Sequence, residues 1–474
     1  MASFFAELWR LRFSIIVGIV AFIAFFFVGG TSYASGVLFN ELLKKPCDDA
    51  YDASTVTGWN STKSFACTLN KTVEHESCNH TSAAPIGTNC GGFGQSRGNT
   101  AWTSSVYFFF STVLCQPSGM LIDRFGPRII AATGGLLFGV GCIAASFTPS
   151  ILTFIIPYGL LGGLGYAFLY PSSIIIVANH WRKRGYGPVA NGITTSGMGV
   201  GTAAFGPISY AIIKTFNWRW YLRVVGFCFF GTSALTLVVY RELKKEANIQ
   251  KRRQFFDRSL LKNPAFILYL IGNVVIYLGV TVPIVHMIRH AVDLCVSQLD
   301  ADYLVIYMGV GSAIGRIIIG FFANHKKLNS VLLFEVCVAS CAIAVFGALF
   351  ITNYGGFVAF MVVYGLFSGA IMSFPVNVVG RVVRKEQIPQ ALGWAIFSEG
   401  PSSIIAAPIA GWLYDATCSY TYSFYFGGGA FASGFLVLLS VPYFLRKYPN
   451  TVDTVVTSEQ NAHRADNALT DFEY

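Results

Sequence analysis

Charged residues are scarce in this chain. Only 12% of its 474 residues are Asp, Glu, Lys or Arg, and 54% are hydrophobic, whereas about a quarter of a soluble domain is charged. This balance excludes an ordinary soluble protein. The formal net charge of +10 does not indicate nucleic-acid binding, because the basic residues lie in short loops between apolar runs and do not form one basic face.

The chain also lacks the short motifs of common enzymes and metal sites. It has no HExxH, GxSxG, P-loop or CxxC arrangement, and its seven His are scattered without ligand spacing. We therefore expect no catalytic residue, no metal and no cofactor. Without an ATP-binding module, any transport must draw its energy from gradients.

Long apolar runs are what the chain has in abundance. A helix needs about 20 apolar residues to cross a bilayer, and twelve segments of the sequence satisfy this. They predict an all-α integral membrane protein, and the first is a span and not a signal peptide, because no A-x-A-like site follows it. The segments are 14–38, 102–121, 128–147, 151–176, 190–213, 220–240, 264–288, 303–323, 329–351, 355–379, 390–413 and 422–445.

The distribution of Lys and Arg predicts the orientation of these spans. With the N-terminus inside, the inner segments hold 23 of the 33 basic residues, the outer segments hold 9, and Arg316 lies within a span. Cytoplasmic loops carry such an excess. We expect both termini to be cytoplasmic.

The one long outer loop, about residues 41–101, supports this orientation. It contains three N-glycosylation sequons and four cysteines, at Asn60, Asn70, Asn79, Cys47, Cys67, Cys78 and Cys90. Sequons are modified in the lumen, and disulfides form in oxidising compartments. The loop predicts a glycoprotein of the plasma membrane, although four cysteines allow three pairings and the sequence does not choose among them.

The chain divides into two similar halves. We expect a six-helix bundle over 1–240, an inner linker over 241–263, a second bundle over 264–445 and a cytoplasmic tail over 446–474. One offset of 201 residues relates the halves, as a duplicated unit requires. It pairs Gly119 with Gly320, Asp123 with Asn324, Lys183 with Arg384, Arg184 with Lys385, Ala190 with Ala391, Gly192 with Gly393, and Pro207 with Pro408.

Two stretches carry a resemblance to a known family. The loop Gly119-Met-Leu-Ile-Asp123-Arg124-Phe-Gly126-Pro-Arg128 resembles the inner-gate signature of the major facilitator superfamily. The run from His180 to Gly201, with a basic cluster before an Ala- and Gly-rich helix, is similar to the helix 5 motif of the monocarboxylate transporter family. The resemblance implies two pseudo-symmetric bundles that rock around a central site, with Asp123, Arg124 and Arg128 as an inner gate. It also implies an accessory glycoprotein as a partner.

The chain departs from this family at two positions. Transporters of lactate and pyruvate have a helix 1 lysine and a helix 8 aspartate four residues before an arginine. Here Tyr33 stands at the place of the lysine and Ser312 at the place of the aspartate, and only Arg316 remains. A proton-coupled mechanism that relies on that pair does not carry over intact.

Two charged residues inside spans are the main candidates for transport chemistry. A charge at mid-membrane costs about 2.5–3.5 kcal/mol on insertion scales, so Arg316 and Glu399 are expected to face a cavity. A guanidinium stays charged and pairs bidentately with a carboxylate, which makes Arg316 the candidate substrate-binding residue. Apolar surroundings favour the neutral form of a carboxyl group, which makes Glu399 the candidate proton carrier.

Other candidates follow from position or from the family. His286 lies at the outer end of helix 7, where a histidine titrates near neutral pH, beside Arg289 at the interface. By analogy with the family, the cavity lining includes Tyr33, Asn273, Phe374 and Asn377.

The sequence therefore predicts a secondary transporter that moves a monocarboxylate or related small organic anion by alternating access, with proton symport. The missing lysine and aspartate leave a second interpretation open, a uniporter for aromatic or amino acid-like substrates. A non-transporting receptor that uses the outer loop is a third. The expected partners are the organic anion, protons and the lipid bilayer.

Overall fold

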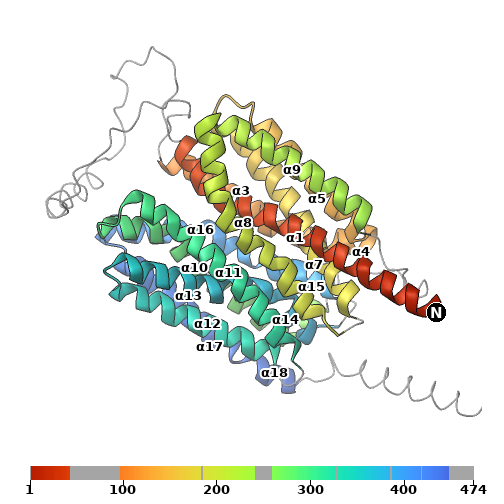
Figure 1. Cartoon of the computed structure of the whole chain (residues 1–474). Coiled ribbons are helices and arrows are strands. Elements are labelled where there is room, and N and C mark those ends of the chain that lie inside the picture. Colours follow the sequence, from red (N-terminus) through yellow and green to blue (C-terminus); the bar gives the residue numbers. More distant parts are fainter. Residues whose placement is uncertain are drawn as a thin grey trace, which may run out of the picture.

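The computed structural model describes residues 2–42, 97–182, 185–240, 259–325, 328–384, 387–417 and 419–447. The three sequons, the four cysteines of the outer loop and most of the linker and the tail lie outside these ranges. Every regular element within them is a helix (Figure 1). The predicted all-α class is confirmed.

The first half contains a long N-terminal helix and five further helical stretches. Its elements are α1 (Ala2–Leu42), α3 (Arg97–Val113), α4 (Cys115–Phe125), α5 (Pro127–Ala145), α6 (Ile151–Phe154), the π-helix η1 (Ile155–Leu161), α7 (Gly162–Arg182), α8 (Gly187–Thr215) and α9 (Trp218–Val239).

The second half repeats this plan with more interruptions. Its elements are η2 (Leu260–Lys262), α10 (Pro264–Asp293), α11 (Gln298–Asn324), α12 (Ser330–Gly347), η3 (Ala348–Phe350), α13 (Tyr354–Ser373), α14 (Pro375–Val382), α15 (Ile388–Phe397), α16 (Glu399–Thr417), α17 (Thr421–Leu438) and α18 (Val441–Lys447).

Each of the twelve predicted segments coincides with helix. In the part of the chain that the structure describes, nine helices are long and apolar enough to cross a membrane, and the α3–α4 pair, bent by 41°, makes a tenth. The α8 helix falls short because it is rich in Gly, Ser and Thr. The faces of α8 that carry small residues are covered by other helices, because Gly197 lies against α1 and Gly199 against α11. These faces do not contact lipid and need not be apolar.

Three predicted spans are interrupted, which the hydropathy pattern does not reveal. The breaks fall at Leu114, Phe374 and Ser398. Pro375 explains the second, because proline has no N–H to continue the hydrogen-bond ladder of α13. Irregular backbone at membrane depth persists where it is buried in protein or lines a cavity, so these breaks direct attention to the interior.

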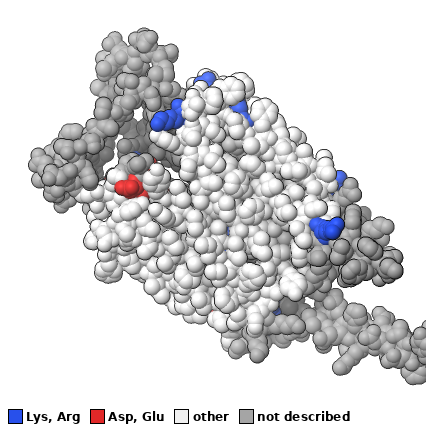
Figure 2. Space-filling model, viewed as in Figure 1, with Lys and Arg blue, Asp and Glu red and all other residues white. Residues whose placement is uncertain are grey.

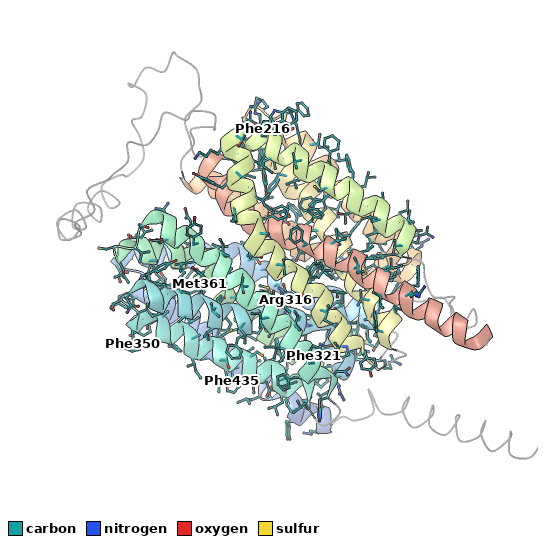
Figure 3. The ribbon with its side chains drawn as sticks, in the orientation of Figure 1. Phe216, Arg316, Phe321, Phe350, Met361 and Phe435 are labelled. Atoms are coloured by element: carbon teal, nitrogen blue, oxygen red, sulfur yellow. The ribbon has the colours of Figure 1, made fainter. Side chains whose placement is uncertain are left out.

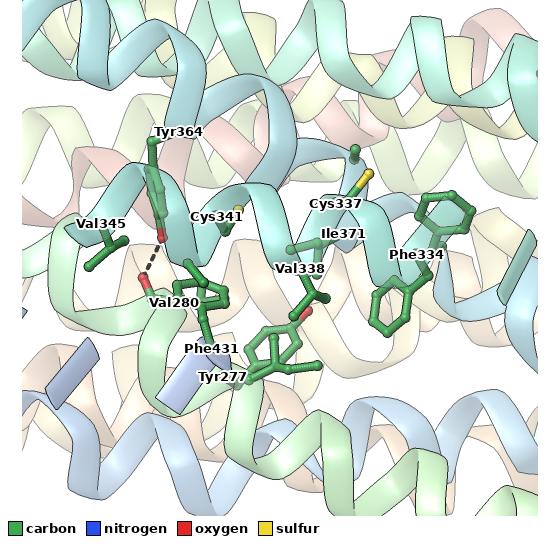
Figure 4. Packing of buried hydrophobic residues seen from close by; sticks show 14 of the residues in the cluster. Tyr277, Val280, Phe334, Cys337, Val338, Cys341, Val345, Tyr364, Ile371 and Phe431 are labelled. Carbon is green, nitrogen blue, oxygen red and sulfur yellow. Dashed lines mark hydrogen bonds between the residues drawn. The ribbon is translucent and has the colours of Figure 1, made fainter. Parts of the chain in front are cut away.

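Each half has its own apolar core. The halves lie side by side in Figure 1, the first coloured red to green and the second green to blue. Figure 4 shows part of the core of the second half, where the Tyr364 hydroxyl donates to the Val280 carbonyl at 2.8 Å among packed aliphatic and aromatic side chains. On the described surface in Figure 2, Lys and Arg gather toward the two ends and leave a broad uncharged band between them, as a bilayer requires.

The halves meet through glycines at two helix crossings that the 201-residue offset relates. A Cβ added to Gly192 on α8 would lie 2.5 Å from the Arg316 carbonyl oxygen on α11, and one added to Gly393 on α15 would lie 2.7 Å from the Cys115 carbonyl oxygen on α4. Adding 201 to 192 and to 115 gives 393 and 316. The sequence repeat is therefore a two-fold relation in space, and side chains as small as hydrogen let these backbones approach.

The same glycines show where the halves separate. Gly192, Gly199 and Gly206 recur every seven residues and so share one face of α8. A Cβ at Gly192 or Gly199 would collide with the α11 backbone, whereas one at Gly206 would meet nothing within 4 Å. The α8 and α11 helices are thus in close contact from their ends at Gly187 and Asn324 as far as Ala203 and Gly309, and this contact has ended at Gly206. We call the contacting end the closed end.

We predict opposite effects of the same substitution at two of these glycines. Gly199→Ala should lower the free energy of unfolding by about 1–3 kcal/mol, because the methyl group overpacks the crossing. Gly206→Ala should raise the free energy of unfolding by up to about 1 kcal/mol, because alanine has the higher helix propensity and the methyl group meets no neighbour there. Thermal unfolding of the purified protein in detergent measures both, and equal midpoints for the two variants would contradict the packing described here.

Candidate functional site

Arg316 is buried where the two halves meet. Its side chain on α11 is 1% exposed, and Figure 3 places it near the middle of the molecule. Its Nε donates to Ser312 Oγ at 3.3 Å, and its Nη1 and Nη2 contact the sulfur atoms of Met198 and Met372 at 3.8 and 3.4 Å. No acidic residue within the described ranges pairs with it. The guanidinium therefore has only one hydroxyl and two thioethers as partners.

The hydrogen-bonding capacity of Arg316 exceeds what these three neighbours supply. A guanidinium has five N–H donors, and a thioether sulfur is a weak acceptor. A buried charge is costly unless a counter-ion accompanies it. A carboxylate that reached Arg316 would replace the thioethers with charge-assisted, bidentate hydrogen bonds. These contacts leave the guanidinium able to accept such a ligand.

Glu399 lies at the second helix crossing. It begins α16 directly after the break at Ser398 and is 8% exposed. Its carboxyl group lies beside the Tyr277 hydroxyl and the Asn273 amide of α10. Asn273 also donates to the Ala395 carbonyl and to Ser398 Oγ, both at 3.0 Å. The break thus fixes a carboxyl group in a polar pocket of neutral donors, with no cation paired to it among the described residues.

Arg316 and Glu399 occupy the two-fold-related crossings. Subtracting 201 from 316 gives Cys115, and subtracting 201 from 399 gives Met198. Arg316 contacts Met198, and its counterpart Cys115 lies near Glu399. Each crossing therefore holds one charged residue and one sulfur-containing neutral residue, with a cation at one and a carboxyl group at the other.

Tyrosines lie around the carboxyl group. Tyr166 and Tyr170, one turn apart on α7, stack with ring centroids 5.3 Å apart, and Tyr166 lies close to Glu399. Tyr170 also donates from its hydroxyl to the Met372 carbonyl at 3.4 Å. The stacked pair therefore reaches from the neighbourhood of Glu399 to a residue that contacts Arg316.

The remaining predicted residues lie on α1, on α10, at the α13–α14 break and on α14. His286 is half-buried 5.5 Å from the Tyr420 ring, and Arg289 is exposed. Phe374 is fully buried and packs on Phe334 in the core of the second half. Asn377 is half-buried on α14. Tyr33 lies in α1, and its side chain is outside the described residues.

The predicted inner-gate loop lies between α4 and α5 at the closed end. Arg128 donates from Nε to the Leu237 carbonyl at 2.7 Å, within its own half. Arg124 is exposed over the Phe125 ring at 5.5 Å, and Asp123 is half-buried. Among the residues that the structure describes, no group of three His, Cys, Asp or Glu could hold a metal ion.

Sequence reasoning missed the neutral partners of the two charged residues. Nothing in the composition or hydropathy of their segments distinguishes Met198, Met372 or Tyr277. The 201-residue offset does single out Met198, because it pairs this residue with Glu399, a charged residue within a predicted span. Met372 and Tyr277 had no such signal, since their roles depend on helix geometry. Cys295, between α10 and α11, is disulfide-bonded and was not among the predicted cysteines.

Comparison with known proteins agrees with this architecture. The sequence profile described as Major Facilitator Superfamily matches residues 22–347 and 336–469. Monocarboxylate transporter 4 of Mus musculus is 28% identical over 394 residues, which cover 78% of this chain and 82% of that protein. Monocarboxylate transporter 12 of Xenopus laevis is 28% identical over 400 residues, covering 77% and 85%.

A solved structure supports the fold independently. The crystal structure of the human organic anion transporter MFSD10 (TETRAN) superimposes with a TM-score of 0.62 at 13% identity, over 90% of this chain and 99% of that one. At this identity the likeness concerns the fold alone. With two helical bundles, two glycine crossings and a profile match over most of its length, the chain is a multi-pass membrane protein that belongs to the Major Facilitator Superfamily of transporters, related to the monocarboxylate transporters.

Proposed function

We propose that this transporter moves a monocarboxylate or related small organic anion by alternating access, with proton symport. The observation that carries the proposal is Arg316, a buried guanidinium at the meeting of the halves with only a hydroxyl and two thioethers as partners. The relatives named monocarboxylate transporters agree with an acidic substrate.

The serine at position 312, where the family resemblance implies an aspartate, supports an anionic substrate. Where the family resemblance expects an aspartate, Ser312 offers Arg316 only a hydroxyl at 3.3 Å. An internal carboxylate would neutralise the guanidinium and compete with the substrate. Without it, the substrate carboxylate is itself the counter-ion, so binding gains the full interaction of a desolvated ion pair.

Glu399 is the residue that we assign to proton coupling. It lies at the crossing related to that of Arg316, among neutral donors, and a carboxyl group in a low-dielectric interior holds its proton until water reaches it. When the site opens to one side, hydration lets the proton leave. Glu399 thus replaces the helix 8 aspartate that the chain lacks.

A gradient-independent uniporter for aromatic or amino acid-like substrates is the alternative. The stacked Tyr166 and Tyr170, together with Tyr277 beside Glu399, favour it, because an aromatic ring packs well on such faces. The two functions differ in whether a proton gradient drives accumulation.

We further propose the plasma membrane as the location, with both termini cytoplasmic. The excess of Lys and Arg in the inner segments and the sequons of the outer loop support this orientation. The disulfide-bonded Cys295 lies in a loop that the same orientation places outside, where disulfides form. An accessory glycoprotein, as the family resemblance implies, remains part of this proposal.

The role of Arg316 predicts a large loss on substitution. In proteoliposomes with an inward proton gradient, we expect Arg316→Gln to reduce uptake of labelled monocarboxylates by roughly 10- to 100-fold, because hydrogen bonds to charged groups are worth about 1.5–3 kcal/mol. Arg381→Gln, which removes an exposed guanidinium from α14, is the control and should transport normally. Undiminished uptake by Arg316→Gln would rule out the anion-binding role.

The role of Glu399 predicts loss of coupling with retention of binding. Glu399→Gln keeps the shape and accepts hydrogen bonds but carries no proton, so we expect exchange of unlabelled for labelled acid to persist while gradient-driven accumulation ceases. Glu335→Gln changes another buried glutamate, on α12, and should accumulate substrate as the wild type does. Gradient-driven accumulation by Glu399→Gln would favour another proton carrier, and wild-type uptake that ignores the gradient would favour the uniporter.

The proposed orientation predicts glycan on the outer loop. We expect the protein expressed in cultured cells to migrate faster on a gel after glycosidase treatment, and the triple variant Asn60→Gln, Asn70→Gln, Asn79→Gln to migrate at the faster position without treatment. An untreated wild type that already migrates with the triple variant would count against an extracellular loop.

A further inference from the structure

The interruption between α13 and α14 leaves backbone groups that need partners. The α13 helix ends at Ser373, and Pro375 begins α14. The last carbonyl groups of a helix have no intrahelical donors, and Pro375 supplies no N–H. The Phe374 N–H bonds the Ile371 carbonyl at 3.2 Å, so the carbonyls of Met372 and Ser373 are those that seek donors elsewhere.

Those donors come from the other half of the protein. The Tyr170 hydroxyl of α7 donates to the Met372 carbonyl at 3.4 Å, and the Asn191 amide of α8 donates to the Ser373 carbonyl at 3.3 Å. The hydroxyls of Thr195 and Ser373 are 3.2 Å apart. We call these five residues the inter-half latch. It joins α7 and α8 of the first half to the end of α13 in the second.

The latch adjoins the guanidinium of Arg316 on both sides. Met372, whose carbonyl is part of the latch, contacts Arg316 Nη2 through its sulfur at 3.4 Å. Met198 lies one turn beyond Thr195 on α8 and contacts Nη1 at 3.8 Å. One guanidinium therefore bridges a thioether from each half. A carboxylate bound to Arg316 would take these N–H donors and end the bridge, because a thioether cannot compete with a charged acceptor.

The latch is built to be reversible. Its three hydrogen bonds measure 3.2 to 3.4 Å, at or beyond the long end of the normal range. In addition, Asn191 Oδ1 is buried without a hydrogen-bond partner. A buried acceptor without a donor recovers its hydrogen bond when water enters, so this atom favours opening of the seam.

We propose that the inter-half latch holds the closed end of the transporter shut and that Arg316, through Met198 and Met372, controls it: a carboxylate on Arg316 removes the thioether bridge and the latch releases. The release step rests on the proposed function of Arg316. The closed end is thus held at the α13–α14 break, deeper than the Asp123–Arg128 loop, whose Arg128 bonds within its own half.

A pair of buried threonines gives a matched test. Thr195 and Thr232 are 0% and 1% exposed, and each hydroxyl donates to the carbonyl four residues earlier in its own helix, at 2.7 and 2.9 Å. Only Thr195 also reaches the other half. Thr195→Val and Thr232→Val therefore cause the same local loss, and they differ in the latch alone.

Two native cysteines report the opening. Cys115, 0% exposed, lies at the α4–α15 crossing: its carbonyl is against Gly393 and its thiol lies near Glu399 of the other half, while the thiol also contacts the Ser111 and Ala167 carbonyls of its own half. Cys142, 1% exposed, lies on α5 in the core of the first half. Opening of the closed end exposes Cys115 and leaves Cys142 covered. Labelling of the purified full-length protein with N-ethylmaleimide, followed by mass spectrometry of each cysteine peptide, gives the two rates separately.

We expect Thr195→Val to label Cys115 about fivefold faster than Thr232→Val, since one hydrogen bond contributes about a factor of five, with Cys142 unchanged in both. Asn191→Ala and Tyr170→Phe each remove another hydrogen bond of the latch and should also increase the labelling rate of Cys115. Arg316→Met removes the bridge without any substrate present, so it should also increase the rate at which Cys115 is labelled.

Equal Cys115 rates in Thr195→Val and Thr232→Val would overturn the latch, and a wild-type rate in Arg316→Met would overturn its control by Arg316. A rise in Cys142 labelling equal to that of Cys115 would mean general unfolding and would also count against the proposal. The experiment uses no substrate, so its failure is distinct from a failure of Arg316→Gln to impair transport.

Discussion

The backbone contact at the two glycine crossings determines the rest of the structure. Gly192 against Arg316 and Gly393 against Cys115 bring main-chain atoms of the two halves within a distance that no larger residue permits. In a bilayer no hydrophobic force draws helices together, so close van der Waals packing is what joins them. Because both crossings lie toward one end, the halves are held there, and Arg316 lies within the α8–α11 contact, which continues past it to Gly309.

The two charged residues are stable in this interior for different reasons. Glu399 has neutral donors, Tyr277 and Asn273, and a carboxyl group satisfies them whether or not it carries its proton. Arg316 has no such freedom, because a guanidinium stays charged. Its oxygen partner within the described residues is the neutral Ser312 hydroxyl, so under the proposed function the substrate anion balances its charge. The backbones of the two crossings are therefore related by a two-fold axis, but their charged side chains differ, with a guanidinium at one crossing and a carboxyl group at the other.

Much of the fold and part of the site followed from the sequence. Long apolar runs located all twelve helical segments, since crossing a bilayer demands them, and the offset of 201 related residues that do prove equivalent in space. Arg316 and Glu399 stood out because charge within a span is costly. The breaks at Leu114 and Ser398 did not, although Pro117 and Pro401 follow them by three residues and each removes the N–H that would bond the carbonyl just before the break. The neutral partners Met198 and Met372 were also hidden, since only the crossing geometry distinguishes them from core residues.

The two-fold relation also explains how two separate residues can be coupled without touching. Arg316 belongs to the α8–α11 crossing and Glu399 to the α4–α15 side of the same interface, at positions that the offset relates through Cys115 and Met198. The two crossings are related by the two-fold axis between the halves. A rigid rotation of one half against the other that preserves this axis therefore opens both crossings together. Under the roles proposed for Glu399 and Arg316, water then reaches both residues in the same movement, and substrate and proton are released to the same side. Coupling in this arrangement is a property of the interface, and it requires no ion pair between Arg316 and Glu399.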